Sequence, residues 1–226
     1  MGKRVFLVGP MGSGKTAVGR QLARLTGGRL HILHVSTAGG VELIRRGKER
    51  GIALTAEVCP HYLALTDQSL RSFDSDYKVN PPLRTHADVL ALIEGLKDGT
   101  IDVIASDHCP QDQDSKRLPF VHAEFGGIGL ETLLALSLEL YHNNHLSLPE
   151  VIRRLTQAPA RILGLAAGAL AKGLPADLIL FDPNKPWVVQ EQAIRSKSKN
   201  TPFERRPVQG MAVRTVIDGR AVHLAS

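Results

Sequence analysis

Three short apolar runs of this chain each end in a histidine or an aspartate. The runs LHILHVS, AEVCPHY and VIASDHCP place His34, His61 and Asp107 at the carboxyl ends of predicted strands. Parallel strands bring such residues to one face of a fold, where the loops form the active site. A metal ion and its water can sit between two imidazoles and a carboxylate there. The sequence therefore favours a parallel α/β fold with a metal site at its strand ends.

Strand-like and helix-like segments alternate along most of the chain. We predict strands at 29–35, 52–58, 77–80 and 101–106, and helices at 40–50, 67–71, 87–97, 130–141 and 149–157. Four strands that each lead through a polar loop into a helix indicate parallel βα units. After a Gly-rich stretch, strand-like runs at 177–181 and 212–217 predict an antiparallel tail without helices of its own.

The composition narrows the class of protein. The 226 residues are 43% hydrophobic, which is enough for a globular core, and the formal charge is +6. Only 4% of the residues are aromatic and no basic run alternates with them, so we expect no nucleic-acid partner. Two cysteines cannot form a disulfide framework, and the opening 1–8 is too short for a secretory or membrane segment. We expect a reduced, cytoplasmic protein without a membrane partner.

A glycine-rich pattern near the start, GPMGSGKT, predicts a turn that binds phosphate. It follows a predicted strand at 4–8 and opens a predicted helix at 15–25, which is the context that this motif requires. The glycines let backbone N–H groups surround a phosphate, the lysine adds positive charge, and the threonine hydroxyl reaches Mg²⁺. The candidate phosphate-binding residues are Gly9, Gly12, Gly14, Lys15 and Thr16. Under this interpretation the ligand is ATP with Mg²⁺.

The stretch that contains this motif, KRVFLVGPMGSGKTAVGRQLARL, resembles the beginning of shikimate kinase. The resemblance implies nucleotide binding. Nothing after Gly28 resembles the acidic segment, the acceptor-binding arginines or the lid of a small kinase. Because a nucleotide needs a second acidic group for its magnesium, we expect no kinase activity. A phosphate-loop module that binds ATP remains an alternative.

From about Leu25 onward the sequence resembles dihydroorotase of the amidohydrolase superfamily. The matching motifs stand in family order: LHILHVSTA, TAEVCPHYLALT, YKVNPPLR, GTIDVIASDHCPQD, SKRLPF, GGIGLET, GLPADLILFDP and NTPFERRPVQG. The resemblance implies the second half of a TIM-type βα barrel, its last four strands, followed by a small β segment. The expected divisions are a phosphate-loop strand-turn-helix at 1–27, the partial barrel at 28–164 and the β segment at 165–226.

The resemblance also implies a reaction. His34 and His61 would bind Zn²⁺, and Asp107 would contact the metal and carry the proton. Zinc lowers the pKa of its bound water and so prepares it to attack a cyclic amide. The reaction would be the reversible conversion of carbamoyl aspartate to dihydroorotate, a step of pyrimidine biosynthesis. The partner would be this small-molecule substrate.

Asn80 would contact the substrate through its amide, and Gly126 and Gly127 would let the backbone approach it. Gln111 departs from the family, since many members carry a second histidine there. The H-x-H pair of the first family strand, the arginine after it and the bridging lysine or aspartate of the fourth strand have no counterpart in these 226 residues. His31 lies within a predicted strand, so it should face away from the site or into packing.

Several alternatives stay open. The three strand-end residues could be packed side chains, and Cys59 and Cys109 could be small buried hydrophobes. The chain could be a non-catalytic dihydroorotase-like subunit that associates with a pyrimidine-pathway enzyme. A half barrel exposes strand edges, which a homodimer could cover, or which the segment 4–25 could cover as a replacement βα unit.

Overall fold

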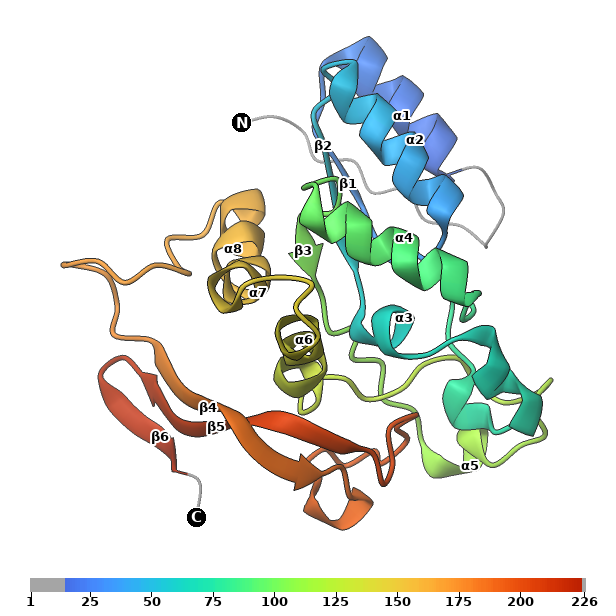
Figure 1. Cartoon of the computed structure of the whole chain (residues 1–226), viewed down its shortest axis with the longest axis vertical. Coiled ribbons are helices and arrows are strands. Elements are labelled where there is room, and N and C mark those ends of the chain that lie inside the picture. The colour runs from blue at the N-terminus through green and yellow to red at the C-terminus, as the bar shows by residue number, and fades with distance from the viewer. Residues whose placement is uncertain (1–14, 225–226) are drawn as a thin grey trace.

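The computed structural model describes residues 15–224, which form two separate sheets and eight α-helices (Figure 1). The parallel sheet contains β1 (Leu30–Ile32), β2 (Leu54–Val58) and β3 (Val103–Ile104), and the antiparallel sheet contains β4 (Leu178–Val188), β5 (Pro207–Ile217) and β6 (Arg220–Leu224). The α-helices are α1 (Lys15–Thr26), α2 (Ala38–Glu49), α3 (Pro60–Ala64), α4 (His86–Lys97), α5 (Gln113–Lys116), α6 (Leu133–His142), α7 (Leu148–Leu155) and α8 (Gln157–Leu163). Short 3₁₀ helices lie at Asp67–Ser72, Ser75–Tyr77 and Glu191–Ala193.

The central strand of the parallel sheet is β2. It pairs in parallel with β1, where Leu30 lies opposite Leu54, and with β3, where Glu57 lies opposite Val103. Apolar side chains of β2 are buried in one cluster with side chains of α2 and α4, which lie along the parallel strands (Figure 1). Since the three strands run in the same direction, their carboxyl ends lie on one side of the sheet. The residues that follow the strands can meet there.

The predicted strand at 77–80 is wrong. A 3₁₀ helix at Ser75–Tyr77 leads into this segment, and β3 pairs directly with β2. Pro81 and Pro82 follow the segment, and proline has no N–H to donate to a sheet ladder. The Tyr62 hydroxyl donates to the Pro81 carbonyl at 2.7 Å, so a side chain fixes this stretch instead. The described part of the barrel therefore has three parallel strands where we expected four.

Most predicted helices are confirmed with ends shifted by a few residues. The predicted helices 15–25, 40–50, 87–97, 130–141 and 149–157 correspond to α1, α2, α4, α6 and α7, and 67–71 is a 3₁₀ helix. Lys15 and Thr16 are the first residues of α1, whereas the predicted strand 4–8 and Gly9, Gly12 and Gly14 lie outside the described residues. Within 15–224, no helix combines the length and the apolar character needed to cross a membrane.

The antiparallel sheet packs against α6, which lies between α7 and β5 (Figure 1). Arg206 forms an ion pair with Glu139 of α6 at 2.9 Å, and Trp187 Nε1 donates to the Gly210 carbonyl at 3.0 Å. The 3₁₀ helix Glu191–Ala193 corrects the expectation of a tail without helices. An apolar cluster joins this part to the rest of the molecule. Its buried members are Ile128, Ala135, Leu136, Val189, Ile194, Phe203 and Val208.

Candidate metal centre

The backbone brings the three predicted strand-end residues to the same side of the parallel sheet. The ladder continues beyond the strands, since Val35 N donates to Glu57 O and Ala105 N donates to Val58 O, each at 3.0 Å. His34 and Asp107 follow β1 and β3 in left-handed conformations, with φ of 53° and 46°. Such backbone costs roughly 1–3 kcal/mol per residue and is concentrated at functional sites.

Asp107 lies between the two imidazoles. Its Oδ1 is 3.7 Å from His34 Nε2, and its Oδ2 is 3.8 Å from His61 Nε2. Ligand atoms around a tetrahedral Zn²⁺ with bonds of about 2.0–2.2 Å stand about 3.4 Å apart, which is close to both separations. Asp107 therefore approaches both imidazoles, through a different oxygen for each, as expected for residues that follow neighbouring parallel strands.

His61 carries a nitrogen without a partner. Its side chain lies in the first turn of α3, the residue is 8% exposed, and Nε2 has no hydrogen-bond partner among residues 15–224. Burial, and then the nearby His34, lower the pKa of His61 to about 3, so its imidazole is neutral at physiological pH. A buried, neutral nitrogen with a free lone pair is the form in which histidine binds a metal. The donor set therefore fits a divalent metal ion.

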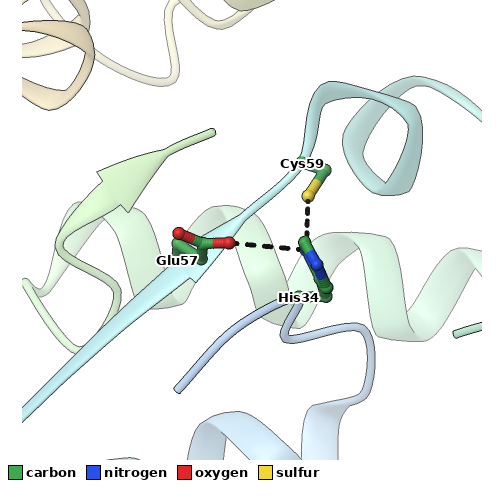
Figure 2. A group of neighbouring side chains, drawn as sticks. All are labelled: His34, Glu57 and Cys59. Atoms are coloured by element: carbon green, nitrogen blue, oxygen red, sulfur yellow. Dashed lines mark hydrogen bonds and ion pairs between the residues drawn. The ribbon is translucent and has the colours of Figure 1, made fainter. Parts of the chain in front are cut away.

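The opposite nitrogen of His34 contacts two residues of the β2 end (Figure 2). Nδ1 lies 3.2 Å from Cys59 Sγ and 3.4 Å from Glu57 Oε1. Glu57 also pairs through Oε2 with His31 Nε2 at 3.1 Å, and His31 Nδ1 bonds to Thr55 at 2.8 Å. With Nδ1 in contact with Cys59 and Glu57, the other ring nitrogen of His34, Nε2, faces Asp107.

Three influences act on the pKa of the Asp107 carboxyl group. Burial raises its pKa, the nearby His34 lowers it, and the negative charge of Glu57 raises it again. The result is a pKa above the ordinary value. Burial and the charge of Glu57 therefore favour the protonated form of Asp107 more than in an exposed aspartate.

A pocket opens at this position. His61 and Asp107 line it together with Gly127, Thr132 and Phe203. The pocket therefore brings two of the predicted metal ligands together with one of the predicted substrate-contacting glycines.

Comparison with known proteins decides the family. The amidohydrolase family profile matches residues 20–222, which is most of the chain. The chain belongs to the amidohydrolase family. It is 48% identical over 193 residues to a dihydroorotase of Wolbachia sp. subsp. Drosophila simulans (strain wRi). This match covers 85% of this chain and 44% of that protein. It is 48% identical over 202 residues to a dihydroorotase of Pelobacter propionicus, which covers 89% of this chain and 48% of that protein.

Solved amidohydrolase structures agree with the fold. The L-hydantoinase (dihydropyrimidinase) from Arthrobacter aurescens superposes with a TM-score of 0.86 at 32% identity, over 91% of this chain and 47% of that chain. The dihydropyrimidinase from Brevibacillus agri NCHU1002 gives a TM-score of 0.87 at 27% identity, over 93% of this chain and 48% of that chain. This amidohydrolase chain spans about half the length of the relatives that it matches.

The resemblance of the amino-terminal stretch to shikimate kinase gains no support. A dihydroorotase of Geotalea daltonii matches 216 residues, or 95% of this amidohydrolase chain, at 45% identity. A match of that length necessarily includes part of the first 25 residues. Phosphate binding stays a prediction for Lys15, Thr16 and the three glycines before them.

The predicted substrate-contacting residues of this amidohydrolase do not all line the pocket. Gly127 lines the pocket, and Asn80 is exposed on the segment before Pro81. The backbone groups of Gly126 are engaged within the protein, because its N–H donates to the Lys78 carbonyl at 2.9 Å and its carbonyl accepts from Lys116 Nζ at 3.0 Å. The roles of all three toward a substrate stay predictions.

Sequence analysis missed two members of the centre. Glu57 and Cys59 occupy alternate positions at the end of β2, and neither belongs to a metal-binding spacing motif. A signal existed for Glu57, since a carboxylate inside an otherwise apolar strand needs a polar partner. For Cys59 the only signal was its position two residues before His61, and a buried cysteine at that position needs no role in metal binding.

The side chain of Gln111, the residue that departs from the family pattern, bonds to the backbone. Its Nε2 donates to the Phe125 carbonyl at 2.9 Å.

Proposed function

We propose that this chain carries the carboxyl-terminal half of a dihydroorotase-type active site, which hydrolyses a cyclic amide with the help of a bound metal. The observation that carries the proposal is the convergence of His34, His61 and Asp107, with the buried nitrogen of His61 free to bind. The dihydroorotase relatives at 48% identity favour dihydroorotate and carbamoyl aspartate as the substrate pair.

The residues that would hold the metal are His34 and His61 through Nε2 and Asp107 through its carboxylate. Two imidazoles and one carboxylate are typical of Zn²⁺. A bound zinc ion supplies Lewis acidity and lowers the pKa of water to about 7. Glu57 keeps His34 in the orientation that exposes Nε2 to the centre.

Asp107 is the proposed proton carrier. It accepts a proton from the attacking water and donates it to the amide nitrogen that leaves the ring. Its raised pKa suits both steps, since the carboxyl group must hold the proton briefly and then release it. Gly127 lies on the wall of the same pocket, where a backbone group without a Cβ beside it can approach a substrate.

We further propose the divisions 28–164 for the partial barrel and 165–226 for the β segment, with 1–27 as a separate leading segment. The proposed partners are the small-molecule substrate and a second polypeptide, either another copy of this chain or a pyrimidine-pathway enzyme. A non-catalytic subunit is the second candidate function.

Zinc content and dihydroorotate turnover of the purified chain test the proposal. We expect about one zinc ion per chain, lost in His61→Asn with the circular dichroism spectrum retained. Asp107→Asn should retain the fold and abolish turnover. His86→Asn, an exposed histidine at the start of α4, is the matched control and should change neither quantity. Unchanged zinc binding in His61→Asn would overturn the assignment, and zinc binding without turnover would favour the non-catalytic subunit.

A further inference from the structure

Cys59 lies where two groups of potential metal ligands overlap. One ligand atom from each of His34, Glu57 and Cys59 lies within 4.8 Å of the others. The same is true of Cys59, His61 and Asp107. Among the described residues, Cys59 is the member that both groups share, so its sulfur lies beside every side chain of the proposed centre.

The local backbone fixes this sulfur in place. Cys59 directly follows β2 in an extended conformation, and Pro60 begins α3 immediately after it. The Cys59 side chain is fully buried, and its Sγ is 3.2 Å from His34 Nδ1 (Figure 2). His61 lies two residues after Cys59, in the first turn of α3. The junction between β2 and α3 therefore places the Cys59 sulfur and the His61 imidazole close together, beside Asp107.

The unpartnered nitrogen of His61 is an independent sign that a ligand belongs at this point. A buried polar atom without a hydrogen bond normally costs about 1–3 kcal/mol, so it calls for a partner that the chain itself does not supply. His61 shares its candidate ligand group with Cys59 and Asp107, one ligand atom of each lying within 4.8 Å of the others. A thiolate, an imidazole and a carboxylate together form a donor set for Zn²⁺.

We propose that Cys59 supplies a sulfur ligand to the metal held by His61 and Asp107, which makes the centre selective for thiophilic divalent ions such as Zn²⁺, Co²⁺ and Cd²⁺. The inference rests on the proposed function for the presence of a metal. As the metal–sulfur bond forms, the S–H bond breaks and the proton leaves to solvent, so binding releases one proton for this ligand. The sulfur provides a protein ligand that the dihydroorotase resemblance does not assign.

The test is titration of the reduced, zinc-free full chain with Co²⁺, followed by absorption spectroscopy. Sulfur bound to Co²⁺ gives an intense charge-transfer band in the near ultraviolet, whereas nitrogen and oxygen ligands give only weaker visible bands. We expect the charge-transfer band in the wild-type chain and its loss in Cys59→Ser, with the affinity for Co²⁺ reduced roughly tenfold or more. Cys109→Ser is the matched control, since it replaces the chain's other cysteine, and it should retain the band.

The outcomes separate this inference from the proposed function. Visible bands without a charge-transfer band in the wild-type chain would overturn the Cys59 ligand and leave the His and Asp centre intact. Loss of the band in Cys109→Ser with retention in Cys59→Ser would overturn it as well. Absence of any Co²⁺ binding would overturn both proposals. Zinc-edge X-ray absorption of the wild-type chain gives a second measurement that needs no variant, and a spectrum without a sulfur neighbour would refute the inference.

Discussion

Asp76 is a partly buried carboxyl group outside the metal centre, and it makes stability depend on pH. Burial raises its pKa to about 6, Asp74 adds to the shift, and Lys116 opposes it. The folded chain therefore keeps a proton that the unfolded chain releases at an ordinary pKa of 3.8. This contribution to stability is fully present below pH 3.8 and is lost as the pH rises through about 6.

Asp76→Asn should consequently stabilise the protein at neutral pH. We expect a gain of about 1 kcal/mol at pH 7, a value reduced for the partial exposure of the group, and almost none near pH 4. Urea unfolding at both pH values measures the difference. Glu49→Gln, at an exposed carboxyl group of α2, should show no comparable pH dependence. An equal gain for Asp76→Asn at both pH values would contradict the assignment of the effect to this proton.

The adjacent glycines 126 and 127 differ in what they tolerate. Gly126 has φ of 113°, and a Cβ there would lie 2.8 Å from Cys109 Sγ and from the Cys109 carbonyl oxygen. A Cβ on Gly127 would meet its nearest neighbours at 3.4 Å, an ordinary contact. We expect Gly126→Ala to lower the free energy of unfolding by about 1–3 kcal/mol and Gly127→Ala to leave it nearly unchanged. Similar denaturation midpoints for the two variants would count against this difference.

At the residue scale, the sequence was sufficient to predict that His34, His61 and Asp107 lie near one another, because the carboxyl ends of parallel strands lie on one side of a sheet. It was not sufficient for Glu57 and Cys59. Their importance depends on which face of β2 is turned toward His34, and a strand buried on both faces gives no alternating pattern from which to read that.

At the element scale, the start of α4 also supports α2. Thr85 and Asp88 form a capping box at the amino terminus of α4. The other oxygen of Asp88 accepts a hydrogen bond from the backbone N–H of Ala38, the first residue of α2, at 2.9 Å. One carboxylate therefore satisfies backbone donors of two helices that cover the same sheet.

Substitutions in this capping box should differ in their cost. We expect Thr85→Ala to destabilise the fold by about 1 kcal/mol, the usual value for a lost cap. Asp88→Ala should cost more, because it also removes the side-chain acceptor of the Ala38 N–H at the start of α2. Ser147→Ala, in the capping box of α7, provides a control with no second helix attached. The three free energies of unfolding rank the effects, and a cost for Asp88→Ala no larger than for Thr85→Ala would disprove the double role.

Helices were easier to predict from the sequence than strands. The 3.6-residue periodicity of α2 and α4 extends over three turns, so their ends were found to within a few residues. The stretch 77–80 alternates like a strand over only four residues, and the prolines that follow it prevent sheet pairing. The short helix α3 has too few residues to show a period, so the turn that presents His61 was not predicted.

At the scale of the whole molecule, one apolar cluster joins the proposed partial barrel to the proposed β segment. Ile128 and Leu136 come from the first part, and Val189, Phe203 and Val208 come from the second. Burial of shared apolar surface couples the unfolding of the parts that share it. The two parts should therefore unfold together rather than as independent domains.

The lone tryptophan allows this expectation to be measured. Trp187 lies in β4 and reports on the antiparallel sheet, whereas far-ultraviolet circular dichroism reports mainly on the helices. We expect coincident transitions for both probes. Phe203→Ala should lower the free energy of unfolding measured by both probes by about 3–5 kcal/mol, because Phe203 is only 4% exposed. Phe73→Ala, at a phenylalanine that is 72% exposed, should shift neither by a similar amount. Separate transitions for the two probes would favour independent domains.

The register of β2 between its neighbours has a consequence for chemistry as well as for packing. Glu57 and Cys59 are two residues apart, so they project from the same face of the strand, toward His34. A slip of β2 by a single residue would exchange them for Ala56 and Val58 and would bring hydrocarbon instead of a carboxylate and a thiol beside the imidazole. The hydrogen bonds that align this strand thus determine which atoms a metal ion would meet.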